Sequence, residues 1–228
     1  MRVPSGPPEK AILWRIGLFL LPSFLRLLFR MRFVGLERLP AGGPTVLAAN
    51  HLSVFDPFML AMATHRRGRV PQFLAAAEFY TRPILGPLVR GIRQIPVHRG
   101  INDRNALDEA VRQLRRGSLV GIFPEGHVGA PPKVRRGKTG VARIALVTGA
   151  PVVPMAIWGT HKRWPLGGLR LSRPLRRHRA IVVMGEPLYP QGDPTSPAAA
   201  RAFTDRIMER IAELVEEARA MDPETPAP

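Results

Sequence analysis

The residues best placed to do chemistry are a histidine and an aspartate that follow an apolar segment. Asn50 ends the segment PTVLAAN (residues 44–50), His51 follows it, and Asp56 lies five residues further on. The segment is typical of a buried strand, and open α/β sheets bind ligands beyond the carboxyl ends of their strands. A histidine there can take a proton from a hydroxyl, and a carboxylate on its second ring nitrogen would fix the tautomer. Alone, the pair also fits a surface histidine beside a helix carboxylate. A metal site is less favoured, because no further ligand of suitable spacing follows.

The segment VGIFPEG, residues 120–126, supplies a second carboxylate. A strand ends there, so Glu125 is expected at the same edge of the sheet as His51. Gly126 lets the backbone turn sharply beside a ligand. An ordinary loop carboxylate is the simpler interpretation of Glu125. Because His51 and Glu125 are expected at the same edge of the sheet, a functional role for Glu125 is favoured.

Two basic segments could bind a phosphate. Arg99 follows a short predicted strand, and its guanidinium offers paired donors that match phosphate oxygens. The segment KVRRGKTG, residues 133–140, precedes a predicted helix, whose N-terminus attracts anions. It surrounds Gly137 with four cations: Lys133, Arg135, Arg136 and Lys138. The spacing is not that of a P-loop, and a solvated basic loop is an equally good interpretation.

Predicted strands and helices alternate along residues 32–220, the main folded domain. The strands cover 44–50, 70–77, 94–97, 118–123, 151–158 and 180–184. The helices cover 56–67, 81–89, 103–116, 139–147 and 198–220. This alternation predicts an α/β fold with a mixed, largely parallel sheet flanked by helices. Residues 1–9 and the tail 221–228 are predicted to be unstructured.

The apolar segment 11–31 precedes this domain. Its longest uncharged stretch, Ile16 to Leu25, has about half of the roughly 20 residues that a spanning helix needs. Pro22 lies in the middle, and arginines flank the stretch. We therefore expect an amphipathic helix or helical hairpin in the membrane interface, with Trp14 at headgroup level. A helix packed on the core is the alternative, and a signal peptide is less favoured.

Composition narrows the classes of partner. The chain of 228 residues has a formal net charge of +17 and no cysteine. The missing cysteine excludes a disulfide scaffold, a cysteine nucleophile and a thiolate metal site. The positive charge favours anionic partners, and it belongs to residues 1–185, because acidic residues outnumber basic ones in 186–228. Aromatic residues make up only 7% of the chain, which favours a lipid surface or phosphorylated molecules over nucleic acid.

Four segments in this order, between about residues 34 and 160, resemble the motifs of the glycerolipid acyltransferases, the 1-acylglycerol-3-phosphate acyltransferases. The first motif, N-H-x-x-x-x-D, is matched by Asn50, His51 and Asp56. The second, a strand that ends in arginine, is matched by Ile95, Pro96, Val97 and Arg99. The third, F-P-E-G, is matched by Phe123, Pro124, Glu125 and Gly126, and the fourth, V-P, by Val153 and Pro154.

The resemblance implies acyl transfer to the sn-2 hydroxyl of lysophosphatidic acid. His51 would be the general base, oriented by Asp56, and Arg99 would bind the glycerol phosphate. The other substrate-binding residues would be Asn50, Glu125, Gly126, Lys133, Arg136 and Lys138. Acyl-CoA or acyl carrier protein would be the co-substrate, with no metal and no other cofactor. The partners would be this donor, a lysophospholipid and an anionic membrane, where each basic residue contributes about 1 kcal/mol. The enzyme would be peripheral or monotopic on the cytoplasmic face of the cell membrane.

Two positions depart from the family pattern. His127 and Val128 stand where threonine or serine and then arginine usually follow the third motif, and Lys133, Arg135 or Arg136 could replace the missing charge. Arg93 stands where a glycine is expected before the second motif. These departures keep two alternatives open. One is the same chemistry on another lysophospholipid or a lipid-linked glycan. The other is a non-enzymatic basic lipid-binding module.

Overall fold

The computed structural model describes residues 12–83, 85–98, 103–131, 134–164 and 177–224. The predictions for Arg99, Lys133, residues 1–9 and the end of the tail therefore lie outside the described residues. The side chain of Trp14 is also outside them.

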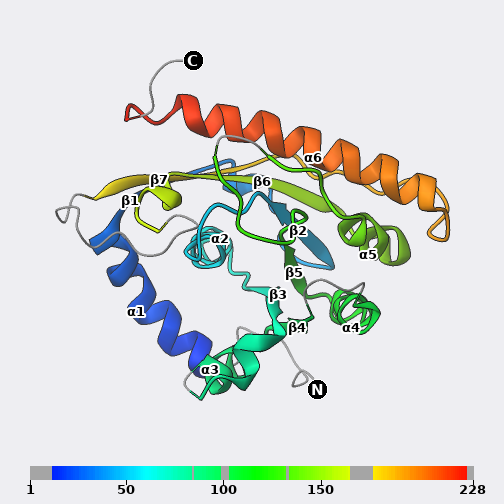
Figure 1. Ribbon diagram of the computed structural model, residues 1–228, viewed down its shortest axis with the longest axis horizontal. Helices are drawn as coiled ribbons and strands as arrows, with labels where there is room; N and C mark the ends of the chain where they lie inside the picture. Colours follow the sequence, from blue (N-terminus) through cyan, green and yellow to red (C-terminus); the bar gives the residue numbers. More distant parts are fainter. Residues whose placement is uncertain (1–11, 84, 99–102, 132–133, 165–176, 225–228) are drawn as a thin grey trace.

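A mixed, mostly parallel sheet forms the centre of the molecule (Figure 1). Its strand order is β1-β7-β6-β2-β5-β3-β4. Every neighbouring pair is parallel except β6 and β7, which run antiparallel. The strands are β1 (Phe29–Val34), β2 (Thr45–Ala49), β3 (Pro71–Ala76), β4 (Ile95–Val97), β5 (Leu119–Ile122), β6 (Val152–Trp158) and β7 (His178–Met184). This arrangement confirms the predicted fold class.

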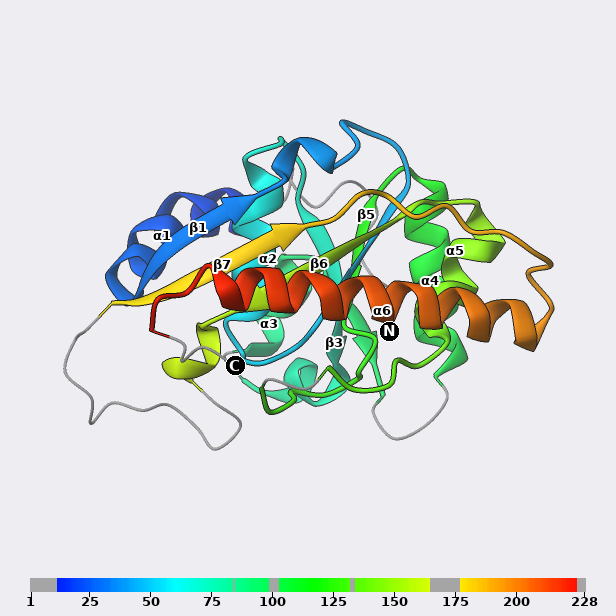
Figure 2. The ribbon, with the colours of Figure 1, turned by 90° about the horizontal axis from the view of Figure 1, so that it is seen from above.

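Helices cover both faces of the sheet. They are α1 (Ile12–Leu28), α2 (Asp56–His65), α3 (Leu85–Gly91), α4 (Arg104–Arg115), α5 (Gly140–Thr148) and α6 (Pro197–Ala220). Successive side chains of β2 pack on opposite faces of the sheet. Val46 and Ala48 pack with α4, α5 and α6, whereas Leu47 and Ala49 pack with α1 and α2. Figure 2 shows α6 running across one face of the sheet.

Capping residues explain where the longer helices begin. The side chain of Asp103 accepts a hydrogen bond from the amide of Ala106 at the start of α4. The side chain of Ser196 does the same for Ala199 in α6. Both satisfy a backbone donor that has no partner within the helix. The predicted starts of these two helices therefore agree with the structure to within one residue.

The helix predicted over 81–89 was placed wrongly. A 3-10 turn at Ala77–Thr81 comes first, and α3 begins only at Leu85. Between them Arg82 is extended, with ψ at 134°. Pro83 follows Arg82, and a residue before proline is disfavoured in the helical region, which separates the two turns.

The apolar segment at the N-terminus gives one helix and the start of a strand. Helix α1 continues through Pro22 and ends at Leu28, and β1, which was not predicted, begins at Phe29 and pairs with β7. Leu25 and Phe29 are fully buried, so one side of this segment packs on the core. The opposite side of α1 leaves apolar side chains exposed. Among the described residues, no helix combines the length and apolar content that a membrane crossing requires.

Candidate functional site

His51 and Asp56 form a buried pair just beyond the carboxyl end of β2. The Nδ1 atom of His51 lies 3.0 Å from Oδ2 of Asp56, which is fully buried at the first position of α2. The same oxygen accepts hydrogen bonds from the amides of Leu52 at 2.6 Å and Ser53 at 2.8 Å. With its Nδ1–H donated to the carboxylate, His51 keeps the Nε2 lone pair for a proton from outside.

Thr160 was not singled out from the sequence, yet it contacts the same carboxylate. Its hydroxyl donates a 2.6 Å hydrogen bond to Oδ1 of Asp56, and Thr160 is fully buried. It begins a 3-10 turn (Thr160–Lys162) that follows β6. Gly159 precedes it with φ at 90°, and a Cβ there would collide with the backbone oxygen of Arg179. A polar residue just past a parallel strand was the signal that could have identified Thr160.

Aromatic stacking fixes the imidazole plane. The ring of His51 lies 4.0 Å from that of Phe123, nearly parallel at 16°. Phe123 in turn stacks on Phe73 of β3, with 5.6 Å between ring centroids. The lack of a side chain at Gly121 makes room for this, because a Cβ there would overlap the Phe73 ring. Packing on one side and the carboxylate on the other therefore leave His51 little rotational freedom.

The side chain of Asn50, next to His51, connects the end of β2 to β6 by hydrogen bonds. Its Nδ2 donates to the backbone oxygen of Ile157 at 3.0 Å, and its Oδ1 accepts from the Ile157 amide at 2.8 Å. Asn50 is 1% exposed. Both ends of its amide are therefore occupied by the backbone of β6, and a role of Asn50 in substrate binding stays a prediction.

Glu125 lies at the expected edge, but its carboxylate points into the protein. Oε1 accepts from the amide of His51 at 3.0 Å, and Oε2 accepts from the amide of Arg135 at 3.2 Å. Burial raises the pKa of the Glu125 carboxyl, although these two backbone donors act in the opposite direction. The oxygen of His51 accepts a 2.7 Å hydrogen bond from the amide of Gly129. Both backbone groups of His51 are thus held, the amide by Glu125 of the third motif and the oxygen by Gly129 in the loop that follows it.

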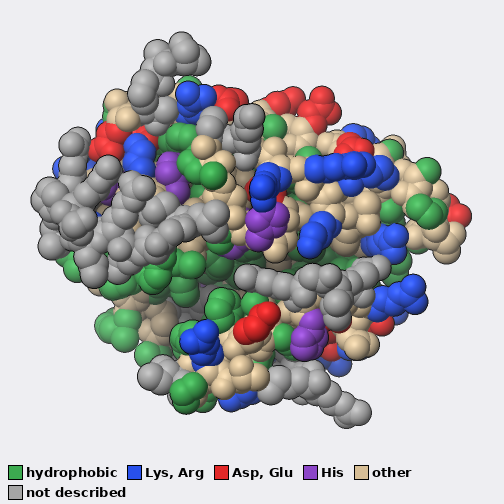
Figure 3. Space-filling view, in the orientation of Figure 1, with side chains coloured by type: hydrophobic (Ala, Val, Ile, Leu, Met, Phe, Trp, Pro, Cys, Tyr) green, Lys and Arg blue, Asp and Glu red, His purple; other side chains and the backbone are tan. Residues whose placement is uncertain are grey.

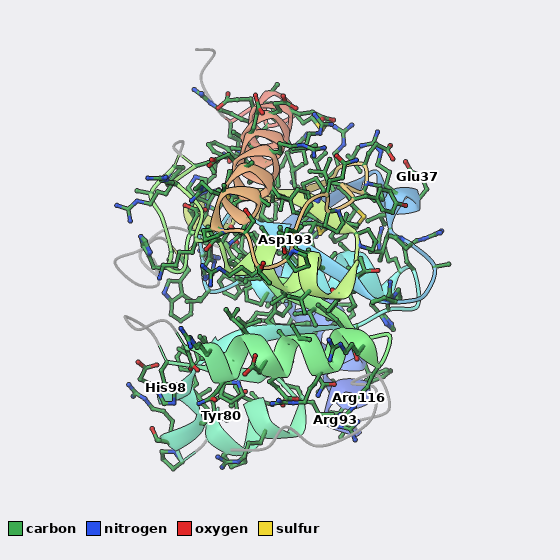
Figure 4. All side chains as sticks on the ribbon, turned by 90° about the vertical axis from the view of Figure 1, so that its right-hand side faces the viewer. Glu37, Tyr80, Arg93, His98, Arg116 and Asp193 are labelled. Atoms are coloured by element: carbon green, nitrogen blue, oxygen red, sulfur yellow. The ribbon has the colours of Figure 1, made fainter. Side chains whose placement is uncertain are left out.

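A cleft of about 200 Å³ opens beside His51. Part of its lining is apolar: Leu74, Val97, Leu107, Ile122, Phe123 and Pro124. The rest is polar or backbone: His51, His98, Asp103, Gly126, Lys138, Thr139 and Gly140. Figure 4 shows His98 at the N-terminal end of α4 and Arg116 at the other end. The cleft thus offers apolar walls together with a proton acceptor and a lysine.

Of the predicted basic loop, Lys138 lines the cleft. Its amide donates to the oxygen of Pro124 at 2.9 Å, which places the loop beside the third motif. The N-terminus of α5 begins directly afterwards, so a cation and a helix dipole act together on an anion there. The side chains of Arg135 and Arg136 are exposed and do not line the cleft. The guanidinium of Arg135 contacts the imidazole of His127.

Gly126 adopts the turn that was expected of it. Its φ is 77°, a conformation that L side chains rarely adopt, and a Cβ would press against the Lys138 side chain. Arg93 also has a positive φ, 57°, at the position where glycine was expected. Within the described part of the chain, no group of three or more His, Asp or Glu side chains is arranged to hold a metal ion.

Comparisons with known proteins find similar sequences and a similar structure. The family model described as Acyltransferase matches residues 30–158. An uncharacterized protein of Mycobacterium tuberculosis is 31% identical over 159 residues, which cover 64% of this chain and 42% of the relative. The 1-acyl-sn-glycerol-3-phosphate acyltransferase of Bacillus subtilis is 27% identical over 184 residues, 78% of this chain and 84% of that enzyme. The chain therefore spans less than half of the mycobacterial relative but most of the Bacillus one.

One solved structure is similar to that of this chain over most of the length of both. The crystal structure of the 1-acyl-sn-glycerophosphate acyltransferase from Thermotoga maritima matches with a TM-score of 0.67 and 26% sequence identity. The match covers 90% of this chain and 80% of that one.

Proposed function

The chain belongs to the acyltransferase family, and from this premise we propose that it transfers a fatty acyl chain from a thioester to the sn-2 hydroxyl of lysophosphatidic acid, which makes phosphatidic acid. The observation that carries the proposal is the His51–Asp56 pair beside a cleft with apolar walls and a lysine. The named activities of the Bacillus and Thermotoga relatives support the same reaction.

The proposed reaction needs one proton acceptor. His51 takes the hydroxyl proton on Nε2 while Asp56 holds Nδ1–H, and the hydroxyl oxygen attacks the thioester carbonyl. The C–S bond then breaks, and the thiol leaves with the proton from His51. General-base catalysis of this kind contributes about 10²–10⁴ in rate. In this proposal the acyl-CoA or acyl carrier protein is a co-substrate, and no metal or other cofactor takes part.

The charge beside the cleft supports a phosphorylated acceptor. Lys138 and the N-terminus of α5 favour an anion there. Arg135 contacts His127, so an arginine stands beside the position where the family resemblance implies one. Arg135 is outside the cleft lining, but it can replace the charge that His127 and Val128 lack, and we keep lysophosphatidic acid as the proposed acceptor.

We also propose that the outer side of α1 lies in the membrane interface. Among the side chains of α1 that the structure describes, the exposed apolar ones are Ile16, Phe19, Leu20, Phe24 and Leu27, and Phe19 is 81% exposed. Helix α3, which contacts α1, adds Leu85 and Leu88. Figure 3 shows hydrophobic side chains gathered on the side where α1 lies, and basic side chains over α5 and α6. An amphipathic helix of this kind would hold the enzyme on the cytoplasmic face, beside a lysolipid delivered from the bilayer.

An acceptor panel tests the proposal. The full chain is incubated with radiolabelled oleoyl-CoA and, separately, with oleoyl carrier protein, each with one lysophospholipid in liposomes. We expect phosphatidic acid from lysophosphatidic acid, and slower acylation of neutral or zwitterionic lysophospholipids, which lack a terminal phosphate. Equal or faster acylation of another acceptor would assign that lipid as the substrate. No acylation of any acceptor with either donor would contradict enzymatic function and favour the lipid-binding module.

A further inference from the structure

The two oxygens of the Asp56 carboxylate are held from different parts of the chain. Oδ2 accepts from the His51 imidazole and from the amides of Leu52 and Ser53, three donors from one short loop. Oδ1 accepts from Thr160, which follows β6 and lies 104 residues away in the chain. The three donors to Oδ2 belong to the loop just before Asp56, so they do not fix the carboxylate relative to the rest of the sheet. Thr160 is therefore the contact that ties the carboxylate to the sheet.

The segment that carries Thr160 is itself fixed at both ends. Before it, the backbone of Ile157 is paired with Asn50, the residue next to His51. After it, Nζ of Lys162 lies 2.5 Å from Oδ2 of Asp222, beyond the end of α6. A charge-assisted pair of this kind, with Asp222 fully shielded from solvent, resists displacement. Thr160 is therefore held where its hydroxyl reaches Asp56.

We infer that Thr160 is a positioning residue for the acyl transfer, acting on His51 through Asp56; this inference rests on the proposed function. An ionised carboxylate only accepts hydrogen bonds, so Thr160 must donate to Oδ1. That bond stops the carboxylate from rotating about its own axis and keeps Oδ2 aligned with the Nδ1–H of His51. The imidazole then stays in the tautomer whose Nε2 can accept the substrate proton.

Replacing the hydroxyl with a methyl group isolates this effect. Thr160→Val keeps the shape of the side chain and leaves Oδ1 without this donor, in a site that is closed to water. We expect kcat to fall by about 10- to 100-fold, the size typical of losing a hydrogen bond to a charged group, with little change in KM. Thr160→Ser, which restores a hydroxyl, should recover most of the loss.

The matched control is Thr204→Val. Thr204 is also fully buried, and its hydroxyl donates to the oxygen of Ala200 within α6, away from the cleft. Thr204→Val should leave kcat close to that of the unaltered protein. An equal loss of kcat in both valine variants would overturn the inference, because it would mean that any buried hydroxyl matters.

A second readout does not depend on the substrate. Nitrogen-15 NMR of the His51 ring reports which nitrogen carries the proton. We expect the Nδ1–H tautomer in the unaltered protein and a mixture of tautomers in Thr160→Val. An unchanged ring spectrum together with an unchanged kcat would contradict the positioning role.

The two readouts also separate the inference from the proposed function. If the unaltered protein acylates no lysophosphatidic acid, the proposed function fails, and the NMR comparison alone decides the role of Thr160. Thermal melts check folding of each variant. Should Thr160→Val not fold, Thr160→Ala removes the hydroxyl without placing a methyl group against the carboxylate, and its tautomers are judged in the same way.

Discussion

Glu125 holds the backbone of His51: its Oε1 accepts a 3.0 Å hydrogen bond from the His51 amide, although 74 residues separate the two in the chain. The other oxygen accepts from the amide of Arg135, in the basic loop. Glu125 is 2% exposed, so its carboxylate connects these two segments of the site from inside the protein. The F-P-E-G motif therefore positions the N-H-x-x-x-x-D motif in this structure.

The pKa of Glu125 predicts a dependence of stability on pH. Burial raises this pKa in the folded protein, so the folded state holds the proton up to a higher pH than the unfolded state does. Between the two pKa values the folded protein binds more protons, and its stability falls as pH rises. The free energy of unfolding, from urea titrations over a pH series, should decrease with rising pH above the usual carboxyl range, relative to Glu125→Gln. If the free energy of unfolding of the unaltered protein, relative to that of Glu125→Gln, stayed constant or increased with rising pH, the prediction would be contradicted.

Asn50 is predicted to act on stability more than on substrate affinity. Asn50→Ala leaves the buried amide and carbonyl of Ile157 without their partners, at a cost of about 1–3 kcal/mol for each group. Urea unfolding should show this loss, whereas Asn105→Ala, at an exposed position of α4, should cost little. A raised KM with unchanged stability would instead support the original substrate-binding interpretation of Asn50.

Arg93 is predicted to be strained. It is the one non-glycine residue of the described chain with a positive φ, which costs about 1–2 kcal/mol for a residue with a Cβ. Arg93→Gly should therefore be more stable to urea than Arg93→Ala by about 1 kcal/mol. The alanine variant removes the same side-chain contacts, so the comparison isolates the backbone. Equal stability of the two variants would mean that the turn relaxes to a negative φ.

The outer side of α1 is predicted to bind membranes. Phe19→Asp removes the most exposed of the described apolar side chains of that helix and adds a negative charge. Because inserting a phenylalanine contributes about 1.5–3 kcal/mol, binding to vesicles of phosphatidylcholine and phosphatidylglycerol should weaken by about tenfold or more. Val147→Asp, at an exposed apolar position of α5, is the control. Equal weakening by both variants in a sedimentation assay would argue against a specific role for α1.

The sequence predicted the sheet well where apolar segments were bounded by clear turn residues. The predicted strands 44–50 and 151–158 match β2 and β6 to within one residue at each end, and the fold class is confirmed. Strand β1 was missed because Phe29 continues the apolar segment of α1. The alternation of exposed arginines with more buried residues in FRMRFV was the available signal.

The location of the site and the contact between Asp56 and His51 were predictable from the sequence, but the other contacts were not. The convergence of His51, Asp56 and Glu125 followed from the rule that parallel strands present their carboxyl ends at one edge. The direction of the Glu125 carboxylate did not follow, because it depends on the backbone amides of His51 and Arg135. Thr160 reaches Asp56 only because β2 and β6 are neighbours, a pairing that the residues alone did not specify.

The role of His51 as the general base is tested by comparing three proteins in one assay: the unaltered chain, His51→Ala and His65→Ala. His65 is an exposed histidine at the end of α2 and serves as the control. Initial rates of acyl transfer from oleoyl-CoA to lysophosphatidic acid are measured in liposomes. We predict that His51→Ala lowers kcat by at least about 100-fold, whereas His65→Ala stays close to the unaltered rate. Turnover by His51→Ala that matches the control would contradict the assignment of His51 as the general base.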